Sequence, residues 1–358
     1  MKLIAILLLI VYSSATLRAQ HKTENIIIIT MDGMRWQEVF GGVDDVLVND
    51  SIFSHDREGI KKKFWAASAT EKRQKLFPFL WTTIAARGQL YGNRQYSNKL
   101  DNANPYWFSY PGYNEIFTGY PDTTINSNDK VLNPNENVLE YIGKQKGYNG
   151  KIAAFTTWDV FPFILNSKRN GIYVNADVDT IKFSAPALKL INDIQFLTPR
   201  PIGVRPDVLT YIAGREYLKA YKPKLLYIAF DETDDFAHGG LYDQYIGSAH
   251  AQDAMMGDLW HTIQAMPQYK DKTTLIVTCD HGRGDKIKSN WQHHGSKIED
   301  AHELWLAVIG PDTAPSGEMK TPGQLYQKQI AATIAQLLGF TFTANHPVAD
   351  PITTIYKK

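Results

Sequence analysis

The sequence has little of several features that would assign it to a specialised class of protein. Cys279 is the one cysteine in 358 residues, so no intramolecular disulfide can form and the core must supply the stability. Because Cys279 ends an apolar run, we interpret it as a small buried residue and not as a catalytic thiol. The 38 basic and 37 acidic side chains leave a net charge of +1. This balance gives no electrostatic reason to expect nucleic acid or an anionic membrane as a partner.

Apolar runs long enough to span a bilayer are missing as well. The run from Leu3 to Val11 is shorter than the ~20 residues that a transmembrane helix needs. It follows Lys2 and precedes small residues up to Ala19, an order typical of a signal peptide. We therefore predict that residues 1–19 are removed and that the mature protein is periplasmic or secreted, without a membrane-spanning segment. A buried first strand or an uncleaved anchor is the alternative interpretation.

The chain does contain an alternation of two kinds of segment. Apolar runs that indicate strands span residues 25–30, 151–156, 225–230, 274–278 and 304–309. Amphipathic stretches that indicate helices span residues 75–88, 138–146, 248–266 and 327–338. This alternation predicts an α/β fold, a three-layer sandwich in which helices cover both faces of a mostly parallel central sheet.

No internal repeat, low-complexity tract or linker divides the chain, so we expect residues 20–358 to form one catalytic domain. Residues 41–67 are charged and irregular and do not continue the alternation. We interpret them as an insertion near the first strand, which fits either a surface excursion or part of the wall around a substrate.

Potential metal ligands follow three of the predicted strands. Asp32-Gly33 comes after the first of these strands, residues 231–238 after the second, and Asp280-His281-Gly282 after the third. In doubly wound sheets, ligands bind at the carboxyl ends of the strands. Three acidic strand ends, two of them with a histidine close by, therefore predict a metal centre.

The spacing within these segments supports the same interpretation. Asp234 and His238 are four residues apart, which places both side chains on one face of a helical turn. A further histidine pair, His293-His294, precedes a glycine. Carboxylate and imidazole ligands without a thiolate favour zinc, with manganese or iron as alternatives.

A candidate nucleophile lies in an aromatic turn. Ser109 follows Tyr106-Trp107-Phe108 and precedes Tyr110-Pro111, just before a stretch that fits a helix. At the N-terminus of a helix the dipole favours anionic oxygens. The alternative interpretation is that Ser109 only caps this helix.

In their order along the chain, these motifs resemble those of the alkaline phosphatase superfamily, in particular its phosphodiesterase and phosphatase branches. The resemblance extends from Asp32 to about Asp312, most of the mature chain. The motifs are Asp32-Gly33, Ser109-Tyr110-Pro111 with Thr118-Gly119, Asp234 with His238, Asp280-His281-Gly282, and His294-Gly295 with Gly310-Pro311.

The resemblance implies two divalent metal ions, with Zn²⁺ expected first. One ion would be held by Asp32, Ser109, Asp280 and His281. The other would be held by Asp234, His238 and His294, with His293 as the alternative to His294 and Asp231 or Asp235 as the alternatives to Asp234. Ser109 would be the nucleophile, and a phosphoserine would form and then be hydrolysed.

The implied substrate is a small-molecule phosphate mono- or diester. Asn126 or Asn128, together with Tyr110, is expected to contact it. Candidate cations for a further phosphate oxygen are Arg35, Lys151, Arg283, Lys286 and Lys288. Sulfuric-ester or phosphonate hydrolysis is an alternative, although Tyr113 stands where formylglycine sulfatases have an arginine. A metal-binding relative without catalysis is the other alternative. The chain has no room for the second domain of phosphoglycerate mutases.

Overall fold

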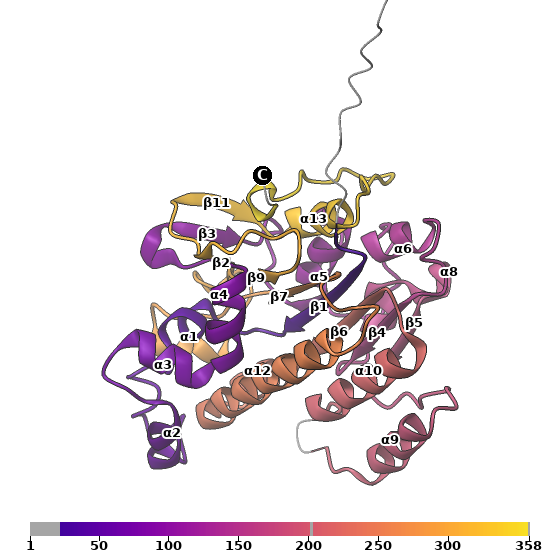
Figure 1. Ribbon diagram of the computed structural model, residues 1–358. Coiled ribbons are helices and arrows are strands. Elements are labelled where there is room, and N and C mark those ends of the chain that lie inside the picture. The colour runs from indigo at the N-terminus through magenta and orange to yellow at the C-terminus, as the bar shows by residue number, and fades with distance from the viewer. Residues whose placement is uncertain (1–21, 201–202, 357–358) are drawn as a thin grey trace, which may run out of the picture.

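The computed structural model describes residues 22–200 and 203–356, and the predicted leader lies outside them. Eight strands form one sheet in the order β10-β2-β9-β7-β1-β6-β4-β5 (Figure 1). In that order they span Gly317–Glu318, Gln89–Tyr91, Leu306–Ile309, Thr273–Thr278, Asn25–Met31, Leu225–Phe230, Ile152–Thr156 and Tyr173–Ala176. A smaller sheet has the order β11-β3-β8, with strands Gly323–Tyr326, Asn98–Asp101 and Glu303–Leu304.

The centre of the large sheet is parallel. β1 pairs in parallel with β6 on one side and with β7 on the other, and β4 and β5 extend the sheet beyond β6. β9 is antiparallel to β7 and β2 is antiparallel to β9. Every residue of β1, β6 and β7 is buried, as expected for parallel strands covered on both faces. This arrangement confirms the predicted α/β sandwich.

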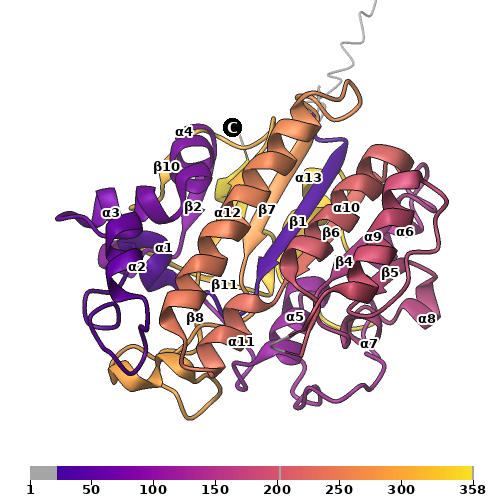
Figure 2. The same cartoon turned by 90° about the horizontal axis from the view of Figure 1, so that it is seen from below.

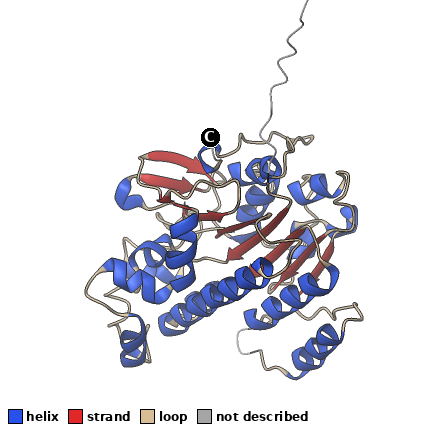
Figure 3. Ribbon diagram, in the orientation of Figure 1, coloured by secondary structure: helices blue, strands red, loops and turns tan. Residues whose placement is uncertain are grey.

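Helices lie on both faces of this sheet, as the colouring of Figure 3 shows. α10 and α12 cover one face, whereas α5, α6 and α13 cover the other (Figures 1 and 2). The α-helices α1 to α13 span, in order, Trp36–Gly41, Arg57–Phe64, Ala69–Leu76, Ala85–Arg87, Ser109–Thr118, Val138–Gly143, Phe161–Ile164, Ser167–Asn170, Pro186–Leu197, Asp207–Tyr221, Glu232–His238, Tyr242–Gln264 and Gln329–Leu337. None of the described helices is long and apolar enough to cross a membrane.

Two predicted segments are interrupted in the structure. The predicted helix 75–88 is instead the end of α3 at Leu76, a π-helical stretch Leu80–Ile84 and the short α4. Pro78 has no backbone N–H to continue a helix, and Asp253 accepts the N–H groups of the two residues that follow Pro78. The predicted strand 304–309 is divided at Trp305 between β8 and β9, which belong to different sheets.

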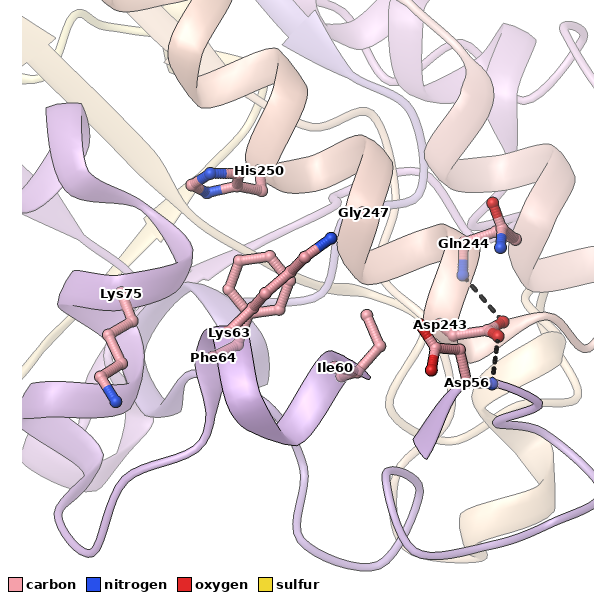
Figure 4. A pocket seen from close by; sticks show the side chains of 9 residues that line it. All are labelled: Asp56, Ile60, Lys63, Phe64, Lys75, Asp243, Gln244, Gly247 and His250. Atoms are coloured by element: carbon pink, nitrogen blue, oxygen red, sulfur yellow. Dashed lines mark hydrogen bonds between the residues drawn. The ribbon is translucent and has the colours of Figure 1, made fainter. Parts of the chain in front are cut away.

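Residues 41–67 fold against the start of α12. Phe53 O accepts the N–H of Tyr242, and the N–H of Asp56 donates to an Asp243 carboxylate oxygen. A cavity of about 510 Å³ lies between α2, which these residues form, and α12. Figure 4 shows Ile60 on one side of this cavity and Gly247 on the other. That the segment is an insertion stays a prediction.

The buried carboxylate of Asp253 should make the stability of the protein depend on pH. This carboxylate of α12 is 1% exposed and accepts from Phe79 N at 2.7 Å and from Leu80 N at 3.0 Å. Burial raises its pKa from the ordinary 3.8 to about 7. The pKa of Asp253 is higher in the folded than in the unfolded protein. The stabilising contribution of Asp253 is therefore present below about pH 4 and is lost as the pH rises through about 7.

Asp253→Asn cannot ionise and removes this contribution. We expect the stability of the wild type relative to the variant to fall by up to roughly 4 kcal/mol between about pH 4 and pH 8. Urea unfolding of both proteins across this range measures the difference. A difference that does not change with pH would contradict the assignment.

Candidate metal centre and active site

Asp32 and Asp280 lie at the carboxyl ends of central strands of the large sheet, close to Asp234 at the start of α11. Asp32 directly follows β1, and Asp280 comes two residues after the end of β7. Because β1, β6 and β7 are parallel neighbours, their carboxyl ends bring these segments together. Figure 2 shows α11 and α5 beside these ends of the strands. Asp32 is 1% exposed and Asp280 is fully buried.

The first group of ligand atoms comes from Asp32, Asp280 and His281, whose atoms all lie within 4.8 Å of one another. His281 Nε2 is 3.3 Å from Asp32 Oδ1 and 3.4 Å from Asp280 Oδ2. The other ring nitrogen, Nδ1, is 2.9 Å from Gly282 O, so a proton on Nδ1 is held by a carbonyl and Nε2 faces the carboxylates. Burial by itself would lower the pKa of His281, but the two carboxylates raise it to about 9.

The second group is built on α11. His238 Nε2 lies 3.2 Å from Asp234 Oδ2, one helical turn away. His294 Nε2 is 2.9 Å from His238 Nε2 and 3.9 Å from Asp234 Oδ1. Asp234, His281 and His294 also offer ligand atoms within 4.8 Å of one another, so His281 joins the two groups.

These six residues are called the acid–histidine cluster below: Asp32, Asp234, His238, Asp280, His281 and His294. Among the described residues, the two sets whose ligand atoms all lie within 4.8 Å of one another include neither His238 nor the alternatives Asp231, Asp235 and His293. His238 is counted in the cluster because of its contacts with Asp234 and His294. His293 is exposed, whereas its neighbour His294 is partly buried and stacks on His281 with ring centroids 4.0 Å apart.

The cluster fits a cation. Tyr113 Oη donates to Asp32 Oδ2 at 2.8 Å, and Gly33 N donates to Asp280 Oδ1 at 3.1 Å. The remaining oxygens, Asp32 Oδ1 and Asp280 Oδ2, are buried and have no hydrogen-bond donor among the described residues. Burial and the charge of Asp32 raise the pKa of Asp280 to about 8. A divalent ion would stabilise both carboxylates, and the donors are oxygen and imidazole nitrogen, which suit zinc.

Ser109 begins α5 and faces this cluster. Its Oγ lies 3.5 Å from His281 Nε2, and the residue is 6% exposed. Phe108 is extended, so the chain turns into the helix at Ser109. The hydroxyl therefore lies at the positive end of a ten-residue helix.

The three residues expected to contact substrate differ in burial and in hydrogen-bond partners. The Tyr110 side chain is buried, and its hydroxyl donates to Val131 O at 2.6 Å, so it is not directed to a ligand. Asn128 Oδ1 accepts the N–H of Tyr110 at 2.9 Å, which ties this loop to the start of α5. Asn126 is exposed.

Four of the five candidate cations form ion pairs with carboxylates of the chain. Arg35 and Arg283 are buried and pair with Glu38 and Asp234. Burial lowers the pKa of Arg283 to about 9. Lys288 pairs with Asp44 and Asp285, and Lys286 pairs with Glu299. Lys151 directly precedes β4, so it lies at the amino ends of the parallel strands, opposite the cluster.

The turn before Ser109 is held by residues that the sequence motifs do not include. Trp107 has a φ of 54°, in the left-handed region that a bulky residue rarely adopts. Its N–H donates to Asn104 Oδ1 and its carbonyl accepts from Gly295 N at 2.9 Å. The fully buried Glu115 accepts from both backbone and side chain of Asn104. In the sequence, the one indication that Glu115 has a structural role is that it is a polar residue within an apolar helical stretch.

Glu115→Gln should destabilise the protein and lower activity. The Glu115 carboxylate also accepts the N–H groups of Ala103 and Lys328, so a glutamine amide would face N–H donors with its own NH₂. We expect a loss of about 3 kcal/mol of unfolding free energy, because buried donors are left without acceptors. Glu136→Gln, which breaks a partly exposed pair with Lys144, is the control and should cost less than about 1 kcal/mol. Equal losses in urea unfolding would contradict this role.

The comparisons with known proteins show the family and the fold of the chain. The sequence profile of the family "Type I phosphodiesterase / nucleotide pyrophosphatase" matches residues 43–333, most of the chain. The chain belongs to this family, and it is a hydrolase that acts on phosphate esters. The family is metal-dependent, and the acid–histidine cluster supplies candidate ligands for the ions. No curated protein matches the sequence.

Solved structures of the alkaline phosphatase superfamily share the fold. A mutant of the alkaline phosphatase PafA is 10% identical, with a TM-score of 0.61, 94% of this chain covered and 99% of that one. Inactive murine ectonucleotide pyrophosphatase / phosphodiesterase 5, in complex with AMP, is 13% identical, with a TM-score of 0.53 and coverages of 91% and 97%. The phosphonate monoester hydrolase of Agrobacterium radiobacter is 12% identical, with a TM-score of 0.56 and coverages of 93% and 77%.

Proposed function

We propose that this protein is a two-metal phosphodiesterase in which Ser109 attacks phosphorus. The observation that carries the proposal is the position of Ser109 Oγ, 3.5 Å from the histidine that joins both ligand groups. Asp32, Asp280, His281 and Ser109 would hold one ion, and Asp234, His238 and His294 the other. When bound, divalent ions would lower the pKa of the serine hydroxyl and stabilise charge on the phosphate oxygens.

The residues of the chain prepare Ser109 for this attack. The N-terminus of α5 favours negative charge on Oγ, and the extended Phe108 fixes its direction. Attack forms the bond from Ser109 Oγ to phosphorus and breaks the bond to the leaving alcohol, which takes up a proton. Water then breaks the bond from Oγ to phosphorus, which releases a phosphate monoester and restores the serine.

The charges around the cluster favour a diester over a monoester. A monoester dianion carries one more negative charge than a diester, and lysine or arginine clamps stabilise such oxygens. The two buried arginines, Arg35 and Arg283, already pair with Glu38 and Asp234. Lys288 is held by Asp44 and Asp285. The family match points in the same direction.

Aryl substrates test the preference directly. The purified mature protein is loaded with zinc and assayed on bis(4-nitrophenyl) phosphate, 4-nitrophenyl phosphate, 4-nitrophenyl sulfate and a phosphonate monoester. We expect kcat/KM for the diester to exceed that for the monoester by at least about tenfold, or about 1.4 kcal/mol. A preference for the monoester, sulfate or phosphonate would replace the diesterase assignment. Bound zinc without turnover of any ester would leave a metal-binding relative.

We also propose that the protein acts in the periplasm or outside the cell. The support is the signal-peptide pattern of residues 1–19, which lie outside the described residues. Expression of the full chain should give a mature N-terminus at Gln20, found by N-terminal sequencing of the periplasmic or secreted fraction. Full-length protein in the cytosol would contradict export.

A further inference from the structure

Arg283 is a buried cation beside the acid–histidine cluster that has no part in the proposed attack. It follows Asp280-His281-Gly282 directly, and its side chain is fully buried. A cation that binds substrate would need an open path to the phosphate. The guanidinium of Arg283 instead contacts protein atoms on two other segments.

These contacts join the two segments that carry the second ligand group. Nη2 of Arg283 pairs with Asp234 Oδ1 and donates to Asp234 O at 3.2 Å. Nη1 donates to Gln292 O at 2.6 Å, two residues before His294. The next residue, Gly284, donates its N–H to His293 O at 3.2 Å. Residues 283–284 therefore hold the start of α11 together with the segment before His294, where the 3-10 helix Lys288–Gln292 ends.

Gly33 makes the space that this arrangement needs. Its φ is +58°, and a Cβ added there would lie 2.7 Å from Arg283 Nε and 2.7 Å from Asp234 Oδ1. Contacts below 3.0 Å require one of these groups to shift. Only glycine at position 33 lets the guanidinium reach Asp234 without displacement.

The shape and charge of arginine both matter here. Its planar fork can donate from two nitrogens to two acceptors, which the single ammonium of lysine cannot reproduce in the same geometry. The charge lies next to a cluster that contains three carboxylates, those of Asp32, Asp234 and Asp280, so it lowers their mutual repulsion. Groups of this kind around metal ligands typically change metal affinity by about 10–100-fold when they are removed.

We infer that Arg283 is a positioning residue that fixes Asp234 and His294 relative to each other and so sets the affinity of the second ion position. The inference rests on the proposed two-metal function, but it concerns metal binding and not the identity of the ester. Arg283 acts through Asp234 and does not touch substrate.

Zinc binding by Arg283→Met and Arg283→Lys tests the inference. Metal-free protein is titrated with zinc in competition with a chromophoric chelator, and bound zinc is counted by mass spectrometry. We expect wild type to bind two ions, and Arg283→Met to bind one of them with unchanged affinity and the other about 10–100-fold less well. Its kcat at low zinc should fall by a similar factor, with KM changed less than about threefold and partial recovery at high zinc. The zinc affinity and kcat of Arg283→Lys should lie between those of wild type and those of Arg283→Met.

Lys286→Met is the matched control. Lys286 lies in the same loop, is exposed and pairs with the exposed Glu299, so both zinc affinities and kcat should stay at wild-type values. If Arg283→Met does not fold, Arg283→Lys carries the test, because it keeps the charge but loses the planar fork and should weaken the same zinc position.

Two results would overturn the inference. Unchanged affinity for both ions in the folded variants would show that Arg283 does not position the ligands. A raised KM with unchanged zinc binding would make Arg283 a substrate contact instead. Wild type that binds two zinc ions but cleaves no ester would contradict the proposed function alone, because the zinc titration still decides the role of Arg283.

Discussion

Ser109→Ala should lower kcat/KM for phosphate diesters by at least about 10⁴-fold. The variant lacks the oxygen that forms the bond to phosphorus. Because the alanine methyl group replaces a small side chain at the N-terminus of α5, we expect zinc content to stay at one to two ions per chain. Steady-state rates with the aryl diester, together with zinc analysis, measure both effects.

The control for this variant is Ser316→Ala. Ser316 is exposed and lies directly before β10, at the far edge of the large sheet, so its loss should leave the rate within about twofold. Residual activity in Ser109→Ala above about one hundredth of wild type would assign the attack to another group, such as water. An acid-stable phosphate on Ser109 after rapid quenching would support the covalent route.

Removal of the bound ions should have the second largest effect. The carboxylates of Asp32 and Asp280 both lie next to His281 Nε2, and each has a buried oxygen without a hydrogen-bond donor among the described residues. We expect a chelator to reduce activity by at least about 10³-fold. The melting temperature should fall on the order of 10 °C, since zinc at about 1,000 times its Kd adds about 4 kcal/mol. Readdition of zinc should restore both.

Asp280→Asn separates two effects of the neighbouring carboxylates of Asp32 and Asp280, which are metal binding and the lower stability of the metal-free protein. The asparagine oxygen can still accept the N–H of Gly33, but one of two neighbouring buried charges is gone. At a pH above about 8, where Asp280 would be ionised in the metal-free protein, the metal-free variant should therefore melt above metal-free wild type. The variant should also lose activity and the gain in stability from zinc. Differential scanning calorimetry with and without zinc shows this. A variant that melts below metal-free wild type would contradict the account of unpaired carboxylates.

Residues at the ends of strands were predictable because the strands themselves are strongly patterned. The apolar run 25–30 became β1, and Asp32 follows it. The four-residue spacing of Asp234 and His238 became one turn of α11. Once parallel strands are expected, their carboxyl ends must meet, so the convergence of these residues needs no knowledge of distant contacts. Their roles as metal ligands stay proposals.

Contacts between distant segments were beyond the reach of the sequence. The pairing of Arg283 with Asp234 depends on the space at Gly33, which only the three-dimensional structure shows. Glu115 lies in the middle of α5, where its pattern did not indicate that it holds the turn before Ser109. The predicted helix 75–88 failed at Pro78, because Asp253 of α12 accepts the N–H groups that a continuous helix would have used.

The most direct test of the account is a crystal structure of the zinc-loaded protein with anomalous data at the zinc absorption edge. We predict two anomalous peaks, one among Asp32, Asp280, His281 and Ser109, and the other among Asp234, His238 and His294. An absence of peaks in zinc-loaded crystals, or zinc bound only away from the acid–histidine cluster, would contradict the two-metal centre and leave Ser109 without the activation that the mechanism requires.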